Sequence, residues 1–289
     1  MTDVVELVLT TSPHDIGAFV VKRALPKRER RHLGPFVFFD HMGPAVLKPG
    51  EGMDVRPHPH IGLSTVTYLF EGEILHRDSL GFVQPIRPGA VNWMTAGRGI
   101  VHSERTAPEL RAGGLRMHGI QTWVALPPDA EETEPGFEHH PADTLPKANV
   151  GGVDLVCILG NAHGLIAPVK VHSPIFYFHA EFPAGTTLAM TDEHAERGFY
   201  VVTGGIEVDG TRHGPGNLVV LREGVAATLR AAEASTVMLL GGAPLPGQRT
   251  IWWNFVSSDK ARLERAKADW KAGKFPKVPG ESEFIPLPD

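Results

Sequence analysis

The chain has 289 residues, of which 32 are glycine and 25 are proline. These two residues make up roughly a fifth of the chain, against about 12% in an average protein, which argues against a bundle of long helices. The formal net charge of −5 excludes the basic surface that binds nucleic acid, so we expect no direct nucleic-acid partner. The longest apolar runs have the length of single strands, far below the roughly 20 residues that span a bilayer, so we expect no membrane association.

Short segments rich in β-branched and aromatic residues recur between glycine and proline turns. This pattern predicts an antiparallel, all-β fold of the sandwich or barrel type. We expect strands at Ala18–Lys22, Phe36–Phe39, Ser64–Phe70, Val91–Met94, Gly119–Ala125, Val153–Leu159, Ile175–Glu181, Phe199–Val202, Leu218–Leu221 and Thr236–Leu240.

One segment near the C-terminus has helical periodicity. Leu263, Ala266 and Trp270 recur at the spacing of one helix face. Either Ser257 or Ser258 can cap the first turn. We therefore expect a C-terminal helix outside the β pattern.

Two parts of the chain resemble one another. Val66–Ile74 aligns with Phe199–Glu207, which places Gly72 opposite Gly205 in a turn between two strands. Further along, Arg87–Val91 aligns with Gly214–Leu218. We interpret this repetition as an internal duplication of one β unit.

The duplication predicts two β-barrels in tandem. Residues 1–130 form the first barrel, which contains the histidine motifs described below, and residues 151–289 form the second barrel with the C-terminal helix. Residues 131–150 are rich in proline and acidic side chains, so we expect a connector there that contributes no core strand.

The N-terminal copy contains two pairs of metal-ligating residue types. His58 and His60 are two residues apart, and on an extended backbone such residues project to the same face. His102 and Glu104 repeat the spacing. On neighbouring strands the two pairs would supply three nitrogen ligands and one oxygen ligand. Solvated loop histidines are the alternative, but two same-face pairs inside one β unit favour a metal site.

The donor types restrict the metal. Three imidazoles and a carboxylate suit a borderline divalent ion such as Fe, Mn, Co, Ni, Cu or Zn, and the lack of thiolate argues against a closed structural zinc site. An octahedral ion with four protein ligands keeps two open positions. An oxygenase needs two such positions for an organic chelate and dioxygen.

Longer strings around these residues resemble the pirin family of the cupin superfamily. The resemblance covers essentially the whole chain, and its most specific part runs from Trp93 to Glu104. It is carried by the strings His58-Pro59-His60-Ile61-Gly62, Tyr68-Leu69-Phe70-Glu71-Gly72-Glu73, His76-Arg77-Asp78-Ser79-Leu80-Gly81, Asn92-Trp93-Met94-Thr95-Ala96-Gly97-Arg98-Gly99-Ile100-Val101-His102-Ser103-Glu104 and His118-Gly119-Ile120-Gln121-Thr122-Trp123-Val124.

The resemblance implies a monomeric bicupin of two jelly-roll barrels with one divalent ion, iron, in the N-terminal barrel. The residues that match the family's ligands are His58, His60, His102 and Glu104, the same four that the spacing selects. No residue is assigned to a separate organic cofactor. Members of this family are described both as quercetin 2,3-dioxygenases and, in animals, as iron-dependent nuclear co-regulators.

Two functional interpretations follow. The first is a metal-dependent dioxygenase that opens the ring of a flavonol such as quercetin with dioxygen, with Glu104 as the catalytic base. The alternative is a non-enzymatic iron-binding regulatory protein that acts through redox-dependent contacts with a protein partner. The partner-regulating branch carries an Arg-Gly-Phe-Glu pattern where this chain has Ile61-Gly62-Leu63-Ser64.

Other polar residues receive secondary interpretations. Cys157 is the single cysteine, so no intrachain disulfide can form and we expect a cytoplasmic protein and a buried, unreactive thiol. The triad-like residues His76, Asp78 and Ser79 are too close in sequence for a hydrolase relay, so we predict a hairpin turn. Four residues are candidates for orienting a ligand imidazole without binding the metal themselves: Asp40, His41, His118 and Gln121.

Overall fold

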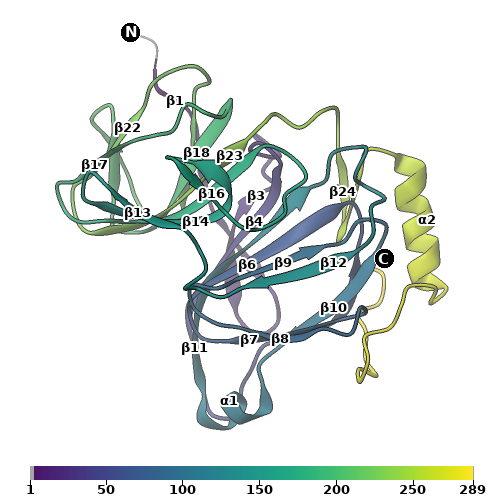
Figure 1. The fold of residues 1–289 in the computed structure, drawn as a ribbon. Helices are drawn as coiled ribbons and strands as arrows, with labels where there is room; N and C mark the ends of the chain where they lie inside the picture. Colours follow the sequence, from purple (N-terminus) through teal and green to yellow (C-terminus); the bar gives the residue numbers. More distant parts are fainter. Residues whose placement is uncertain (1–2, 289) are drawn as a thin grey trace. The chain divides into compact units, whose positions relative to one another are not determined.

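The computed structural model describes residues 3–288. Within this range the chain forms 25 strands and two helices, which confirms the all-β fold (Figure 1). The chain divides into two compact units. The C-terminal cupin unit comprises the chain up to Pro13, Lys22–Phe39 and Asp143–Pro244, and the N-terminal cupin unit comprises His14–Val21, Asp40–Ala142 and the chain from Leu245 onward.

The C-terminal cupin unit contains two antiparallel sheets. Its larger sheet has the order β1-β21-β18-β23-β16-β14-β13, with β15 paired to β14, and its smaller sheet has the order β17-β22-β19-β20. The strands are β1 (Val5–Thr10), β13 (Lys147–Val150), β14 (Val153–Ala162), β15 (Leu165–Ile166), β16 (Ile175–Phe182), β17 (Thr187–Ala189), β18 (Glu196–Thr203), β19 (Ile206–Val208), β20 (Thr211–His213), β21 (Asn217–Leu221), β22 (Thr228–Ala231) and β23 (Ser235–Gly242).

The core of this unit follows the two-residue period of its strands. On β16, Phe176, Phe178 and Ala180 point to one face and are fully buried in a single apolar cluster. Leu239 of β23 and Phe199 of β18 join the same cluster. Apolar side chains thus fill this barrel.

The N-terminal cupin unit contains a four-stranded sheet of order β5-β10-β7-β8. The seven-stranded sheet has the order β12-β9-β6-β11-β4-β3-β2. The elements are β2 (Ser12–Asp15), β3 (Val20–Leu25), β4 (Phe36–Leu47), β5 (Asp54–His60), β6 (Leu63–Glu71), β7 (Ile74–Asp78), β8 (Val83–Ile86), β9 (Val91–Thr95), β10 (Ile100–Arg105), α1 (Pro108–Gly113), β11 (Leu115–Ala125) and β12 (Gly136–His140).

The duplicated hairpins are present, with a shift of one residue in their alignment. Gly72 joins β6 to β7 with φ +94°, and Gly204 joins β18 to β19 with φ +77°. A Cβ at either position would collide with a backbone oxygen, that of Arg116 or that of Ala234. The turn glycine equivalent to Gly72 is therefore Gly204, which corrects the expected match with Gly205.

The segment 131–150, expected to be a connector without core strands, contains two strands. β12 lies at the edge of the seven-stranded sheet and pairs with β9, while β13 lies at the edge of the larger sheet of the C-terminal cupin unit. Pro135 and Pro141 flank β12 directly, and Pro146 precedes β13. Proline cannot donate to a sheet ladder, so it stands outside these strands and limits their length.

The end of the chain folds in the N-terminal cupin unit. β24 (Thr250–Trp252) and β25 (Phe255–Ser257) form a hairpin, followed by α2 (Lys260–Lys271), the expected helix. The side chain of Asp259 caps α2 by accepting the Ala261 N–H at 2.8 Å. The predicted caps, Ser257 and Ser258, bind Glu131 instead. In residues 3–288, neither helix combines the length and apolarity needed to cross a membrane.

Candidate metal centre

Two neighbouring strands bring the predicted histidines together. His58 of β5 lies opposite His102 of β10 in the antiparallel register, and His60 follows on the same face of β5. The His58 and His102 ring centroids are 4.4 Å apart, and each lies 5.0 Å or less from the ring of His60. All three side chains are buried, and each offers a nitrogen within 4.8 Å of the others, so they could hold a metal ion.

Backbone acceptors fix the orientation of two of these rings. His58 Nδ1 lies 2.9 Å from the Arg56 carbonyl oxygen, and His60 Nδ1 lies 3.1 Å from the Asn254 carbonyl oxygen. A carbonyl oxygen can only accept, so Nδ1 carries the proton in both rings and Nε2 keeps its lone pair. The Nε2 atoms of His60 and His102 are 3.1 Å apart. These two Nε2 atoms therefore lie close enough to bind one metal ion together.

Burial keeps these imidazoles neutral. It lowers the pKa of His58 to about 4, and it lowers the pKa values of His60 and His102 well below the usual value for histidine. The neighbouring histidines add to the effect, because a second positive charge in the cluster is unfavourable. Neutral imidazole is the form that binds a metal, so the site suits a cation at neutral pH.

Glu104 is buried on the same strand as His102. A register irregularity lies between these two residues in the pairing with β5. Gln121 of β11 donates from Nε2 to both carboxylate oxygens, at 2.9 and 3.1 Å. Burial raises the pKa of Glu104, while hydrogen bonds from Gln121 and Thr67 lower it. The described donor cluster consists of the three histidines, so a ligand role for Glu104 stays a prediction.

The four residues predicted to orient a ligand imidazole, Asp40, His41, His118 and Gln121, differ in what they contact. Gln121 contacts Glu104, as described. His41 and His118 contact each other through their Nε2 atoms at 2.8 Å. Asp40 is buried and precedes His41 on β4.

The sequence interpretation missed the role of His76. Its Nε2 lies 2.9 Å from Asp78 Oδ2, and its Nδ1 lies 3.4 Å from His102 Nδ1. The other oxygen of Asp78 accepts the Leu80 and Phe82 N–H groups, so the predicted turn is present as well. His76 and Asp78 have the same two-residue spacing as the ligand pairs, and that signal could have identified a third polar pair on this sheet.

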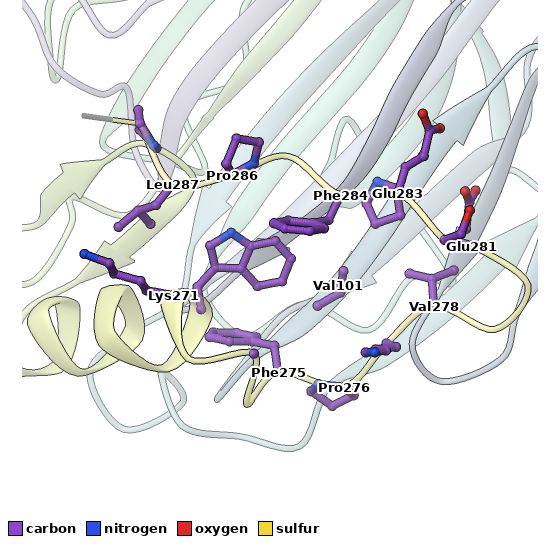
Figure 2. Close-up of a pocket in the computed structure, with 16 residues that line it drawn as sticks. Val101, Lys271, Phe275, Pro276, Val278, Glu281, Glu283, Phe284, Pro286 and Leu287 are labelled. Carbon is purple, nitrogen blue, oxygen red and sulfur yellow. The ribbon is translucent and has the colours of Figure 1, made fainter.

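A cavity lies on the other face of the ligand strands. It has a volume of about 860 Å³, and Figure 2 shows aromatic and proline side chains of the C-terminal segment around it. Pro57 and Val101 line it, and they alternate along β5 and β10 with His58 and His102. Side chains at successive strand positions point to opposite faces, so this cavity is separate from the histidine cluster.

The fold and the site define a two-cupin protein with a candidate metal centre in its N-terminal cupin. The family model described as Pirin matches residues 18–124, and the model for the pirin C-terminal cupin domain matches residues 177–276. The chain belongs to the pirin family.

Individual relatives agree with this assignment. A pirin-like protein of Caulobacter vibrioides is 52% identical over 99% of this chain and 100% of its own length. Mouse pirin is 30% identical, with 88% of this chain and 87% of its own length covered. A crystal structure of a quercetin 2,3-dioxygenase from Acinetobacter baumannii superimposes with a TM-score of 0.90 at 35% identity, covering 98% of this chain and 95% of that one.

Proposed function

We propose that the protein is a metal-dependent dioxygenase that uses dioxygen to open the ring of a flavonol such as quercetin. The observation that carries the proposal is the buried cluster of three neutral imidazoles with convergent Nε2 atoms. The similarity to a quercetin 2,3-dioxygenase over nearly the whole of both chains supports the choice of reaction.

The proposed ligands are His58, His60, His102 and Glu104. We propose iron as the ion, with Mn, Co, Ni, Cu or Zn as alternatives that the same donors accept. When bound, such an ion lowers the pKa of a coordinated hydroxyl and brings the two reactants together. The three imidazoles supply no negative charge, so a carboxylate from Glu104 would offset part of the charge of a divalent ion.

Glu104 is the proposed catalytic base. A flavonol offers a 3-hydroxyl beside a 4-keto group, and the hydroxyl must lose its proton before the pair can chelate an ion. Gln121 donates to both Glu104 oxygens, so a neutral amide orients the carboxylate. Its burial withdraws it from water and makes it a better proton acceptor than an exposed glutamate.

The test measures oxygen uptake and loss of flavonol absorbance with protein of known metal content. We expect one dioxygen consumed per quercetin. His58→Ala should lose metal and activity together, whereas Glu104→Gln should lower kcat by about 10²–10⁴-fold, the usual contribution of a positioned base. Glu207→Gln, on β19 of the C-terminal cupin unit, is the matched carboxylate control and should retain the wild-type rate. Equal rates in all four proteins, or no oxygen uptake by the metal-loaded wild type, would refute the proposal.

A further inference from the structure

Every ring in the histidine cluster has a hydrogen-bonding partner at its outer nitrogen. For His58 and His60 this partner is a backbone carbonyl oxygen. For His102 it is the side chain of His76, through a contact between the two Nδ1 atoms. A carbonyl oxygen has one possible role, whereas an imidazole nitrogen can donate or accept. The contact with His76 therefore bears on which nitrogen of His102 carries the proton.

Asp78 determines the state of His76. The Asp78 carboxylate can only accept, and it lies 2.9 Å from His76 Nε2, so that nitrogen carries a proton. His76 Nδ1, 3.4 Å from His102 Nδ1, is then the atom placed to accept a proton from His102 when a metal ion occupies the Nε2 side of that ring. This leaves the lone pair of His102 on Nε2, the atom that lies 3.1 Å from His60 Nε2.

The pair is held rigidly in the sheet. His76 is 3% exposed and its ring stacks on Phe137, with the centroids 4.4 Å apart and the planes 16° apart. Asp78 is fully buried, and its second oxygen is occupied by two backbone N–H groups of the turn. The antiparallel register of β7 and β10 places Asp78 opposite His102 and His76 opposite Glu104. The geometry that connects the three side chains is thus set by the sheet itself.

We propose that His76, backed by Asp78, is a positioning residue that holds His102 in the tautomer with its proton on Nδ1 and so keeps Nε2 free for a metal ion. The inference rests on the three-histidine site and not on the dioxygenase reaction. It concerns the affinity and electronic environment of the ion, which can be measured without turnover.

The first experiment measures Co²⁺ binding to metal-free protein by calorimetry and by the visible absorption of the bound ion. His76→Phe keeps a ring that can stack on Phe137 but removes the acceptor. We expect it to weaken Co²⁺ binding by about 10–100-fold, the usual effect of losing the hydrogen-bonding partner of a ligand, and to shift the visible bands. His76→Gln should recover most of the affinity, because its amide can accept from His102 and donate to Asp78.

The C-terminal cupin unit offers a matched control. His179 Nε2 contacts Glu181 Oε1 at 2.8 Å, with the same two-residue spacing on strand β16. His179→Phe should leave the Co²⁺ affinity and spectrum unchanged. Wild-type affinity and spectrum in His76→Phe, or equal losses in the Phe and Gln variants, would overturn the proposal.

A second measurement needs no variant and so is independent of folding defects. Long-range ¹H–¹⁵N correlation spectra of the wild-type protein loaded with diamagnetic Zn²⁺ report which ring nitrogen of each histidine is protonated. We expect His102 to carry its proton on Nδ1 and His76 on Nε2. A proton on His102 Nε2 would overturn the proposal, whatever the protein does with a flavonol.

Discussion

Glu131 binds the segment Arg249–Ser258, which contains Asn254, the partner of His60. Its replacement by glutamine should destabilise the N-terminal cupin unit. Its carboxylate forms an ion pair with Arg249 Nε at 2.9 Å, with the two side chains 7% and 2% exposed. It also accepts from the Ser257 hydroxyl at 2.9 Å and from the Ser258 N–H at 2.9 Å. Removing one partner of a buried ion pair typically costs about 3–5 kcal/mol, because the other charge is left uncompensated.

For Glu131→Gln we expect the free energy of unfolding to fall by about 3 kcal/mol, near the lower limit of this range. The glutamine amide oxygen can still accept a hydrogen bond, and Arg249 keeps its bonds to the carbonyl groups of Pro246 and Leu126. For a unit of about 150 residues this corresponds to a melting temperature lowered by about 6–12 °C. Metal binding should weaken as well. Asn254, whose carbonyl orients His60, lies between the two anchored positions Arg249 and Ser257.

The assays are thermal unfolding followed by calorimetry and Co²⁺ titration of the metal-free protein. Glu132→Gln is the neighbouring control: Glu132 is 58% exposed and pairs with Arg262 at 2.7 Å. An exposed pair contributes about 0–1 kcal/mol, so this variant should unfold close to the wild type. If Glu131→Gln is no less stable than Glu132→Gln, the buried ion pair does not hold the segment and the reasoning is refuted.

Three further predictions concern the cluster and the free thiol. Burial lowers the pKa of His58 to about 4, so the unfolded chain binds more protons at this residue between pH 6.5 and 4, and the shift of His58 alone should cost the metal-free protein about 3 kcal/mol of stability over that interval. His58→Gln should remove this contribution and make the decline in pH-dependent denaturant unfolding less steep; an unchanged slope would contradict the prediction. A metal at 100 times its Kd should stabilise the wild type by about 2.7 kcal/mol. In thermal shift measurements, His60→Ala should lose this stabilisation, whereas His14→Ala, a variant at an exposed histidine, should keep it. Burial raises the pKa of Cys157 to about 12, so the native protein should not react with a disulfide reagent at pH 8. Protein unfolded in guanidinium should release one equivalent of the reagent's thiol. Rapid reaction of the native thiol would show that it is accessible and contradict the prediction.

The sequence was sufficient to locate the ligand pairs because their geometry is local. His58 and His60 need only an extended backbone to share a face, and the same holds for His102 and Glu104. The period of two is a property of any strand, so it survives errors in the bounds of β5 and β10. The composition of neither strand is typical of a buried strand, since β5 contains two prolines and both strands contain many polar residues.

The partners of the ligands could not be predicted in the same way. His60 meets a carbonyl 194 residues away, and a backbone acceptor leaves no signature in residue type. The contact between His76 and His102 depends on the register of β7 against β10, and a shift by one residue would turn His76 to the opposite face. Similarly, the cap of α2 shifted to Asp259 because Glu131, distant in sequence, occupies both serines.

The contact between His60 and Asn254 has a consequence for biosynthesis. The ribosome makes the chain from its N-terminus, so the three imidazoles exist long before residue 254 emerges. Until then His60 Nδ1 lacks the Asn254 carbonyl, and Glu131 has neither Arg249 nor Ser257 to bind. A metal ion that meets the nascent chain therefore finds an incomplete site. We expect stable loading to follow translation of the C-terminal segment, and a chain arrested before residue 245 to retain metal less well than the released protein.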